Sequence, residues 1–208
     1  MSQRIWDISQ VLRPGLPVWP GDTAFSHIPT WSMSDSSPVN VSALTLSTHS
    51  GAHADAPLHY TAAGASIEAV GLEPYLGECL VIDARGCGPL VEPRHLPPLD
   101  GARRVLLRTY EAFPHDAWDS RFTAVAPATI DALAAQNVIL IGLDSPSLDP
   151  ETSKTMAAHH AIARADMRVL EGLVLDDVPP GRYELIALPL AIAGADAAPV
   201  RAVLRSLP

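Results

Sequence analysis

Cysteine is scarce in this chain of 208 residues, which contains only Cys79 and Cys87. Two cysteines are too few for the disulfide framework that stabilises small secreted domains. The N-terminal residues, MSQRIWD, also lack the apolar stretch of a signal peptide. The sequence therefore predicts a protein of the reducing cytoplasm.

Long apolar runs are missing as well. The longest one covers residues 185–195 and is interrupted by Pro189, whereas a helix that crosses a bilayer needs roughly 20 apolar residues. Positive charge is also sparse, because 14 Lys and Arg stand against 23 Asp and Glu, giving a net charge of -9. We therefore expect no membrane span and no nucleic-acid partner, since binding to phosphates needs clustered basic side chains.

The length and the remaining composition indicate one globular domain over residues 1–208. Apolar residues make up 48% of the chain and charged residues 18%, while aromatic residues reach only 5%. A chain of this length and composition can form one sizeable hydrophobic core but is too short for two domains of ordinary size. The 20 prolines and 13 glycines are spread along the chain, which predicts many short elements joined by shaped loops.

Strand-like runs outnumber helical ones. Residues 138–143 are continuously apolar, as in a central strand covered on both faces. They follow a helical pattern over 127–136 that has proline in its first turn, and a second helix is expected over 154–164. Together these runs predict an α/β fold with a mixed β-sheet and peripheral helices. The other predicted strands cover residues 5–8, 42–48, 80–84, 104–109 and 184–188.

One segment carries most of the chemical information. Between residues 49 and 59, His49, His53, Asp55 and His59 occupy odd positions and are separated mainly by small residues. Odd positions of an extended chain project to one side, and histidine and aspartate are ligands of ions such as zinc. The leucines of residues 42–48 alternate like those of a half-buried strand, so we expect that strand to run directly into the histidine segment. The segment predicts a metal site.

The same segment must bend to bring its ends together. A straight strand would place the α-carbons of residues 49 and 59 about 33 Å apart, too far for shared ions. Gly51 and Pro57 supply the positions where a bend is expected. We expect His53 and Asp55 to share an ion, His49 to join them by curling back, and His59 to lie at the rim.

Other residues allow two interpretations from the sequence alone. His159 and His160 are adjacent on a predicted helix, so at most one easily faces a given site. Glu171 lies in an apolar run and needs a partner, which is either a metal ion or a nearby arginine. Trp19 lies in a proline-rich loop and either lines a pocket or packs on the core. Residues 110–122 form either a lid or a long surface loop.

The chain resembles the cyclase-like metal-dependent hydrolases, and within them the bacterial kynurenine formamidases. The segment HSGAHADAPLH over residues 49–59 is similar to their His-x-Gly-x-His-x-Asp-x-Pro-x-His signature. Further similar segments are DSPSLDP at 144–150, AAHH at 157–160, LEGL at 170–173, YELIALPL at 183–190, GAD at 194–196 and PVRA at 199–202. The resemblance runs nearly from end to end.

The resemblance implies a swivelling β/α/β fold, usually a homodimer, that hydrolyses N-formyl-L-kynurenine to L-kynurenine and formate in tryptophan degradation. It implies two zinc ions per subunit, although manganese or another divalent ion can use the same ligand types. His59 would carry protons and Trp19 would contact the substrate. The implied ligands are His49, His53 and Asp55 for the first ion, and Asp55, His159 and Glu171 for the second, with Glu171 also touching the first.

Two other functions compete with this one. A related enzyme of the isatin hydrolase type would open a cyclic amide with the same metal signature. A protein of the same fold could also bind metal, or a small molecule, without catalysis. His59 argues against a purely structural metal site, because such a site needs no additional proton carrier.

Overall fold

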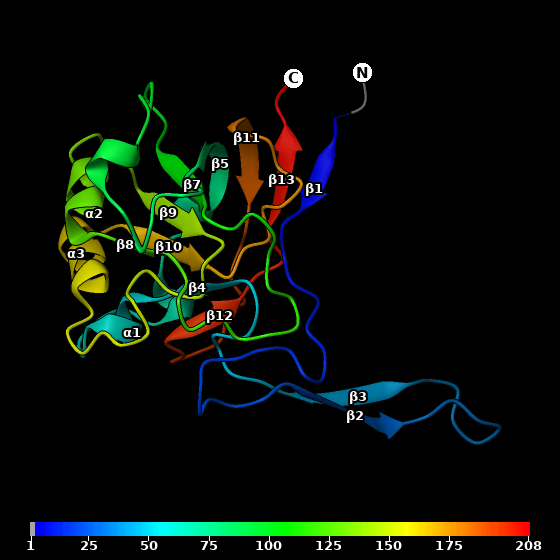
Figure 1. Ribbon diagram of the computed structural model, residues 1–208. Helices are drawn as coiled ribbons and strands as arrows, with labels where there is room; N and C mark the ends of the chain where they lie inside the picture. The colour runs from blue at the N-terminus through cyan, green and yellow to red at the C-terminus, as the bar shows by residue number, and fades with distance from the viewer. Residues whose placement is uncertain (1–2) are drawn as a thin grey trace.

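A mixed β-sheet of nine strands organises the computed structural model, which describes residues 3–208 (Figure 1). Met1 and Ser2, part of the segment considered above for a signal peptide, lie outside these residues. In spatial order the strands are β1 (Ile5–Asp7), β13 (Val203–Ser206), β11 (Gly181–Ile186), β5 (Leu76–Asp83), β7 (Arg104–Arg108), β9 (Leu140–Leu143), β10 (Arg168–Glu171), β4 (His53–Asp55) and β12 (Ala197–Pro199).

The four strands β5, β7, β9 and β10 are parallel, and antiparallel strands flank them on both sides. Two helices, α2 (Pro127–Ala134) and α3 (Ala157–Ala165), lie against one face of the sheet (Figure 1). Ile130 and Ile162 of these helices pack with Ile141 and Val169 of the strands in one buried cluster. The predicted α/β architecture with a mixed sheet and peripheral helices is therefore confirmed.

The opposite face of the sheet forms a second core. Leu106, Leu140 and Leu170 point into it and pack with Ile8 and Leu185. The remaining short elements are α1 (Pro57–Tyr60), the 3₁₀ turns η1 (Ile67–Ala69), η2 (Glu73–Tyr75) and η3 (Pro93–His95), and the paired strands β6 (Leu90–Val91) and β8 (Ala124–Val125). Burial on both faces explains why the central strands are continuously apolar.

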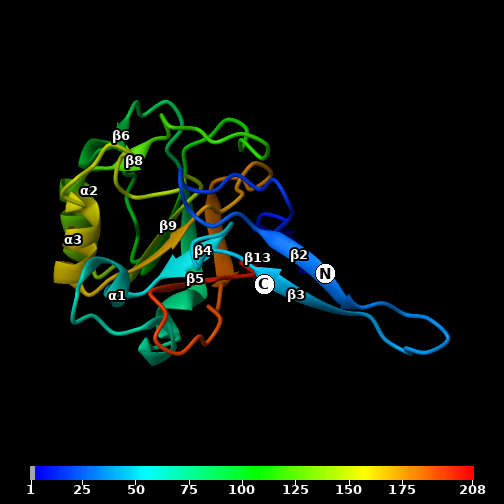
Figure 2. The same ribbon diagram turned by 90° about the horizontal axis from the view of Figure 1, so that it is seen from below.

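A two-stranded hairpin projects away from the rest of the molecule (Figures 1 and 2). It consists of β2 (Ser26–Trp31) and β3 (Val41–Thr45), which pair only with each other. The prediction of a half-buried strand over 42–48 is wrong in two respects. All five residues of β3 are exposed, with Leu44 at 57%, and the strand ends before a turn that separates it from the histidine segment. An alternating pattern fits an exposed apolar arm as well as a strand of the core.

The second predicted helix begins later than expected, at Ala157 instead of residue 154. Met156, directly before it, has a left-handed backbone with φ of 48°, and this conformation cannot continue a helix backwards. Within residues 3–208, the helices are too short or too polar to cross a bilayer.

Candidate metal centre

Strand pairing places the first candidate ligands beside one another. β4 lies between β10 and β12, and its register sets Glu171 directly opposite His53. Residues opposite each other on neighbouring strands have their β-carbons about 5 Å apart. His53 and Asp55 project from the same side of β4, as the spacing in the sequence predicts. The pairing therefore gathers three polar side chains within an apolar sheet.

A turn at Gly51 returns His49 to this group. Gly51 has φ of +66°, a backbone conformation that glycine adopts readily, and a β-carbon there would lie 2.7 Å from Leu12 Cδ2. The carbonyl oxygen of Gly51 accepts a hydrogen bond from His53 Nδ1 at 2.9 Å. The bend that the sequence predicts at this residue is present, and it also orients the imidazole ring of His53.

Helix α3 contributes His159 to the same group. Asp149 accepts hydrogen bonds from the backbone N–H groups of Ala158 and His159, at 3.0 and 3.1 Å, and so caps the first turn of the helix. The same carboxylate lies 2.7 Å from His159 Nδ1. His159 is buried, whereas His160 is exposed and points elsewhere.

The facing atoms form a compact ring around Asp55. Asp55 Oδ1 lies 3.1 Å from His49 Nδ1 and 3.5 Å from His53 Nε2. Its second oxygen, Oδ2, lies 3.4 Å from His159 Nε2. Glu171 closes the ring, with Oε2 3.5 Å from His53 Nε2 and Oε1 3.4 Å from His159 Nε2. The carboxylate of Asp55 thus separates two groups of ligand atoms.

The chemistry of these atoms fits divalent cations. His53 Nε2, His159 Nε2 and both carboxylate oxygens of Asp55 are buried and have no hydrogen-bond partner among residues 3–208. With Nδ1 donating to the Gly51 carbonyl, the neutral tautomer of His53 would direct a lone pair from Nε2 toward carboxylate oxygens. Acceptors facing acceptors are unfavourable unless positive charge lies between them. Ligand atoms of His53, Asp55 and Glu171 lie within 4.8 Å of one another, close enough to share an ion.

Each candidate histidine has an acceptor on its outer nitrogen. Gly51 provides its carbonyl for His53, Asp149 its carboxylate for His159, and Asp196 its Oδ2 for His49 Nε2, at 3.1 Å. Metal-bound histidines usually donate their second N–H group in this way, which fixes the tautomer and orients the ring. The candidate ligands are therefore themselves oriented by a further set of acceptors around them.

The carboxylates make the ring strongly attractive to positive charge. Burial disfavours ionisation of Asp55, but the neighbouring His159 and His49 rings hold the pKa of its carboxyl well below its ordinary value. Burial would lower the pKa of His49, yet Asp55 and Asp196 raise it to about 9. Protons and a divalent ion would therefore compete for the same positions, so the affinity for the ion would fall as pH decreases.

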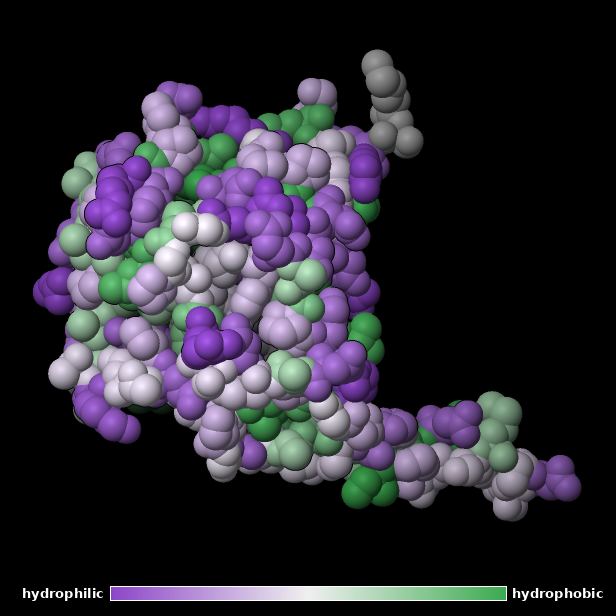
Figure 3. Space-filling view, in the orientation of Figure 1, coloured by the Kyte–Doolittle hydropathy of each residue, from purple (hydrophilic) through white to green (hydrophobic). Residues whose placement is uncertain are grey.

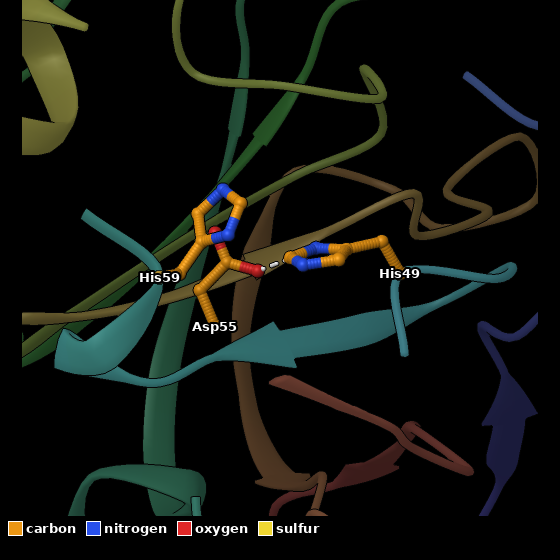
Figure 4. Close-up of side chains that lie close together, drawn as sticks. All are labelled: His49, Asp55 and His59. Carbon is orange, nitrogen blue, oxygen red and sulfur yellow. Dashed lines mark ion pairs between the residues drawn. The ribbon is translucent and has the colours of Figure 1, made fainter. Parts of the chain in front are cut away.

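His59 lies at the open side of the ring, on α1. His49 and His59 flank the carboxylate of Asp55 in Figure 4, and the side chain of His59 is 28% exposed. Asp196 Oδ2, which contacts His49, also lies 3.4 Å from His59 Nδ1. The hydroxyl group of Thr48 donates to the other oxygen of Asp196 at 3.0 Å. One carboxylate thus connects the ring of candidate ligands to the exposed histidine.

A cavity of about 370 Å³ opens onto these groups and is lined by His49, His53, His59 and Glu171 at one end. This size is within the range of small-molecule sites. Trp19 also lines the cavity, with 37% of its surface exposed. Of the two sequence interpretations of Trp19, the structure supports the pocket position. The seven residues singled out from the sequence are thereby brought to one site.

A family model described as "Putative cyclase" matches residues 6–150. This chain belongs to that family. Kynurenine formamidase of Maricaulis maris (strain MCS10) is 62% identical over 207 residues, which cover 99% of each chain. Kynurenine formamidase of Erythrobacter litoralis (strain HTCC2594) is 57% identical over 207 residues, covering 100% of this chain and 96% of the relative. The resemblance stated from the sequence is confirmed, and so is the enzyme class, a hydrolase.

Solved structures of the cyclase family share the fold. One described as a potential metal-dependent hydrolase with cyclase activity superposes with a TM-score of 0.85 at 27% identity, over 100% of both chains. The predicted cyclase-like fold class is thus confirmed, and metal dependence agrees with the histidine and carboxylate group found here.

Three carboxylates of this cyclase-family site have no role in the sequence analysis. Asp149 and Asp196 occur within the resembling segments, but nothing in their local sequence marks them as partners of histidines. Asp144 lines the cavity and accepts hydrogen bonds from Thr109 and from the backbone N–H group of Tyr110. Burial raises the pKa of Asp144 to about 6, although these hydrogen bonds oppose the increase. Its position directly after a buried parallel strand is the one signal that predicts a site residue.

Proposed function

We propose that this chain hydrolyses N-formyl-L-kynurenine to L-kynurenine and formate, in tryptophan degradation. The observation that carries the proposal is the 62% identity to a kynurenine formamidase over nearly the whole of both chains. The ring of histidines and carboxylates at the end of a cavity supports it, because amide hydrolysis needs an activated water beside a substrate pocket.

The proposed ligands divide into two groups around Asp55. His49, His53 and Asp55 would hold one divalent ion, and Asp55, His159 and Glu171 the other, with Glu171 also reaching the first. Zinc fits this set of nitrogen and oxygen donors, and manganese uses the same ligand types. Such ions supply Lewis acidity and lower the pKa of water from 15.7 toward about 7.

His59 is the proposed proton carrier of the reaction. Water adds to the formyl carbon and loses a proton to His59, the carbon–nitrogen bond breaks, and the amine nitrogen receives the proton. Formate and L-kynurenine are the products. Histidine suits both steps because its ordinary pKa of about 6.5 lies near neutrality. Asp196 acts as a positioning residue, because its contact with Nδ1 leaves the other ring nitrogen free to face the reacting water.

We also propose that the protein is a homodimer. The hairpin of β2 and β3 supports this, because Ile28, Trp31 and Leu44 are each at least 57% exposed. Figure 3 shows strongly apolar surface at the base of this arm and smaller, weakly apolar patches on the arm itself. Exposed apolar surface of this extent typically marks an interface. The cytoplasmic location expected from the sequence stays a prediction.

The direct test measures release of L-kynurenine from N-formyl-L-kynurenine by the purified protein, together with elemental analysis. We expect turnover that a chelator abolishes and that added zinc or manganese restores. Isatin serves as the comparison substrate, since the related isatin hydrolase activity uses the same metal signature. Preferential opening of isatin would overturn the substrate assignment, and full activity in a metal-free sample would overturn the proposed metal chemistry.

A further inference from the structure

Two tryptophans from distant loops meet in the wall of the cavity. Trp19 and Trp118 both line it, and their ring centroids lie 5.3 Å apart at an angle of 71°. Phe122, which is buried, packs against both rings with centroid distances of 6.4 Å. Edge-to-face packing of this kind holds aromatic rings in a defined geometry. The wall of the cavity therefore includes a preformed aromatic corner.

Glu151 fixes the orientation of Trp118. The indole Nε1–H group of Trp118 donates to Glu151 Oε2 at 2.7 Å, which is the short distance expected for a hydrogen bond to a carboxylate. Glu151 itself comes from the loop that precedes α3. Trp118 is thus held by a ring on one side and by a carboxylate on the other, so its face keeps one direction within the cavity.

The surroundings of this corner favour an aromatic ligand. Val18, Phe113 and Met156 add apolar surface to the cavity wall, and among the described residues no lysine or arginine lines it. A ligand group that fits here is flat and carries no negative charge. N-formyl-L-kynurenine carries such a group, the benzene ring to which its formamide nitrogen is attached.

We infer that Trp118 is a second substrate-contact residue, which binds the aryl ring of the formamide together with Trp19, and that Glu151 is its positioning residue. This inference rests on the proposed function. The two tryptophans, whose ring planes are inclined at 71°, provide a wall against which an aryl ring lies, while the formamide group extends toward His59 and the candidate ligands. The corner thereby selects N-formyl arylamines over aliphatic formamides.

The experiment compares Trp118→Ala, Trp118→Phe, Glu151→Ala and Glu151→Gln in the metal-loaded enzyme. We expect Trp118→Ala to raise the KM for N-formyl-L-kynurenine, and the Kd of L-kynurenine, by about tenfold without a change in kcat. Trp118→Phe keeps an aromatic ring and stays near the wild type. Glu151→Ala releases the indole and raises KM by about threefold, whereas Glu151→Gln restores the acceptor and the wild-type KM.

Fluorescence provides a readout that does not depend on turnover. L-Kynurenine bound beside Trp118 quenches its emission, so Trp118→Phe should lose part of the quenching seen in the wild type. Trp6→Phe is the matched control, because Trp6 lies on β1 and packs against Tyr183, away from the cavity. In Trp6→Phe, the decrease in fluorescence on binding of L-kynurenine should be the same as in the wild type.

An unchanged KM in Trp118→Ala, or a loss confined to kcat, overturns the inference while the proposed function stands. If Trp118→Ala does not fold, the pair at Glu151 decides, and equal KM values in Glu151→Ala and Glu151→Gln overturn the inference. Absence of N-formyl-L-kynurenine hydrolysis in the wild-type enzyme is a different result, because it overturns the proposed function itself.

Discussion

In the candidate metal centre, the two ring nitrogens of each histidine have different roles: one faces the candidate ligand group and the other faces an outer acceptor. In His159, Nδ1 lies 2.7 Å from the carboxylate of Asp149, and Nε2 faces Asp55 and Glu171. An outer acceptor of this kind raises the basicity of the ligand and prevents the ring from rotating. The site therefore depends on residues that touch no ion.

Replacement of this outer carboxylate tests that dependence. We expect Asp149→Asn to lower metal affinity by about 10- to 100-fold, while the amide oxygen still caps α3. Competition with a chromophoric chelator measures the affinity, and circular dichroism measures the helix. Asp131→Asn, an exposed position on α2, is the control and should behave like the wild type. An Asp149→Asn variant with unchanged affinity would contradict the assigned role.

A second substitution separates proton transfer from metal binding. We expect His59→Ala to lower kcat by about 10²- to 10⁴-fold, the usual contribution of a general acid or base, while metal content remains near that of the wild type. Steady-state kinetics and elemental analysis check both expectations. His160→Ala removes the exposed histidine next to His159 in the sequence and should retain full activity. Loss of metal from His59→Ala would instead identify His59 as a ligand.

The residues of the site differ in how far the sequence could predict them. His49, His53, Asp55 and His59 share one short segment, so their spacing alone indicated a metal site and the bend at Gly51. Choosing His159 and Glu171 required the family resemblance. Asp149 and Asp196 are single acidic residues in ordinary loops, and only the folded arrangement of distant segments brings them to the histidines.

At the scale of elements, two tight turns hold the ligand strands together. Gly172 follows Glu171 at the end of β10 and has φ of +65°, and a β-carbon there would lie 2.6 Å from the carbonyl oxygen of Gly51. That same oxygen accepts the hydrogen bond from His53 Nδ1. The two turns therefore approach each other closely at the Gly51 carbonyl, whose oxygen also orients the candidate ligand His53.

We expect Gly172→Ala to destabilise the fold and to weaken metal binding together. Any alanine with positive φ costs about 1 to 2 kcal/mol, and here the added methyl group also displaces the Gly51 carbonyl. Gly86→Ala is a matched control, because Gly86 has φ of +74° and nothing within 4 Å of the added β-carbon. Thermal unfolding and metal titration of both variants separate backbone strain from the contact. Equal effects would show that the contact is unimportant.

The elements themselves were predicted unevenly. β9 and α2 were evident because one is continuously apolar and the other has helical periodicity after a proline. β4 and β12 contain three residues each, too few for any periodicity to identify them. The sequence predicts β3 as a strand, but it also predicts that one side of this strand is buried. The alternation of leucine with polar residues shows that the strand has an apolar side, but not whether the core covers that side.

At the scale of the whole molecule, the projecting hairpin exposes apolar side chains to solvent. We expect Leu44→Asp, which places a charge on β3, to convert the proposed homodimer into monomers. Analytical ultracentrifugation measures the change. Leu72→Asp is the control, because Leu72 is similarly exposed, at 55%, and lies outside the hairpin. A dimer that persists in Leu44→Asp, or a wild-type protein that is already monomeric, would contradict the role of the arm.

The neighbours of β4 have a consequence for how the protein matures. β4 lies between β10 and β12, strands that follow it by more than a hundred residues in the chain. While the ribosome is still translating the C-terminal segment, His49, His53 and Asp55 already exist but lack Glu171 and the Asp196 carboxylate. In a nascent chain the proposed ligand set would therefore be incomplete, and stable binding of a metal ion would have to wait until synthesis is nearly finished.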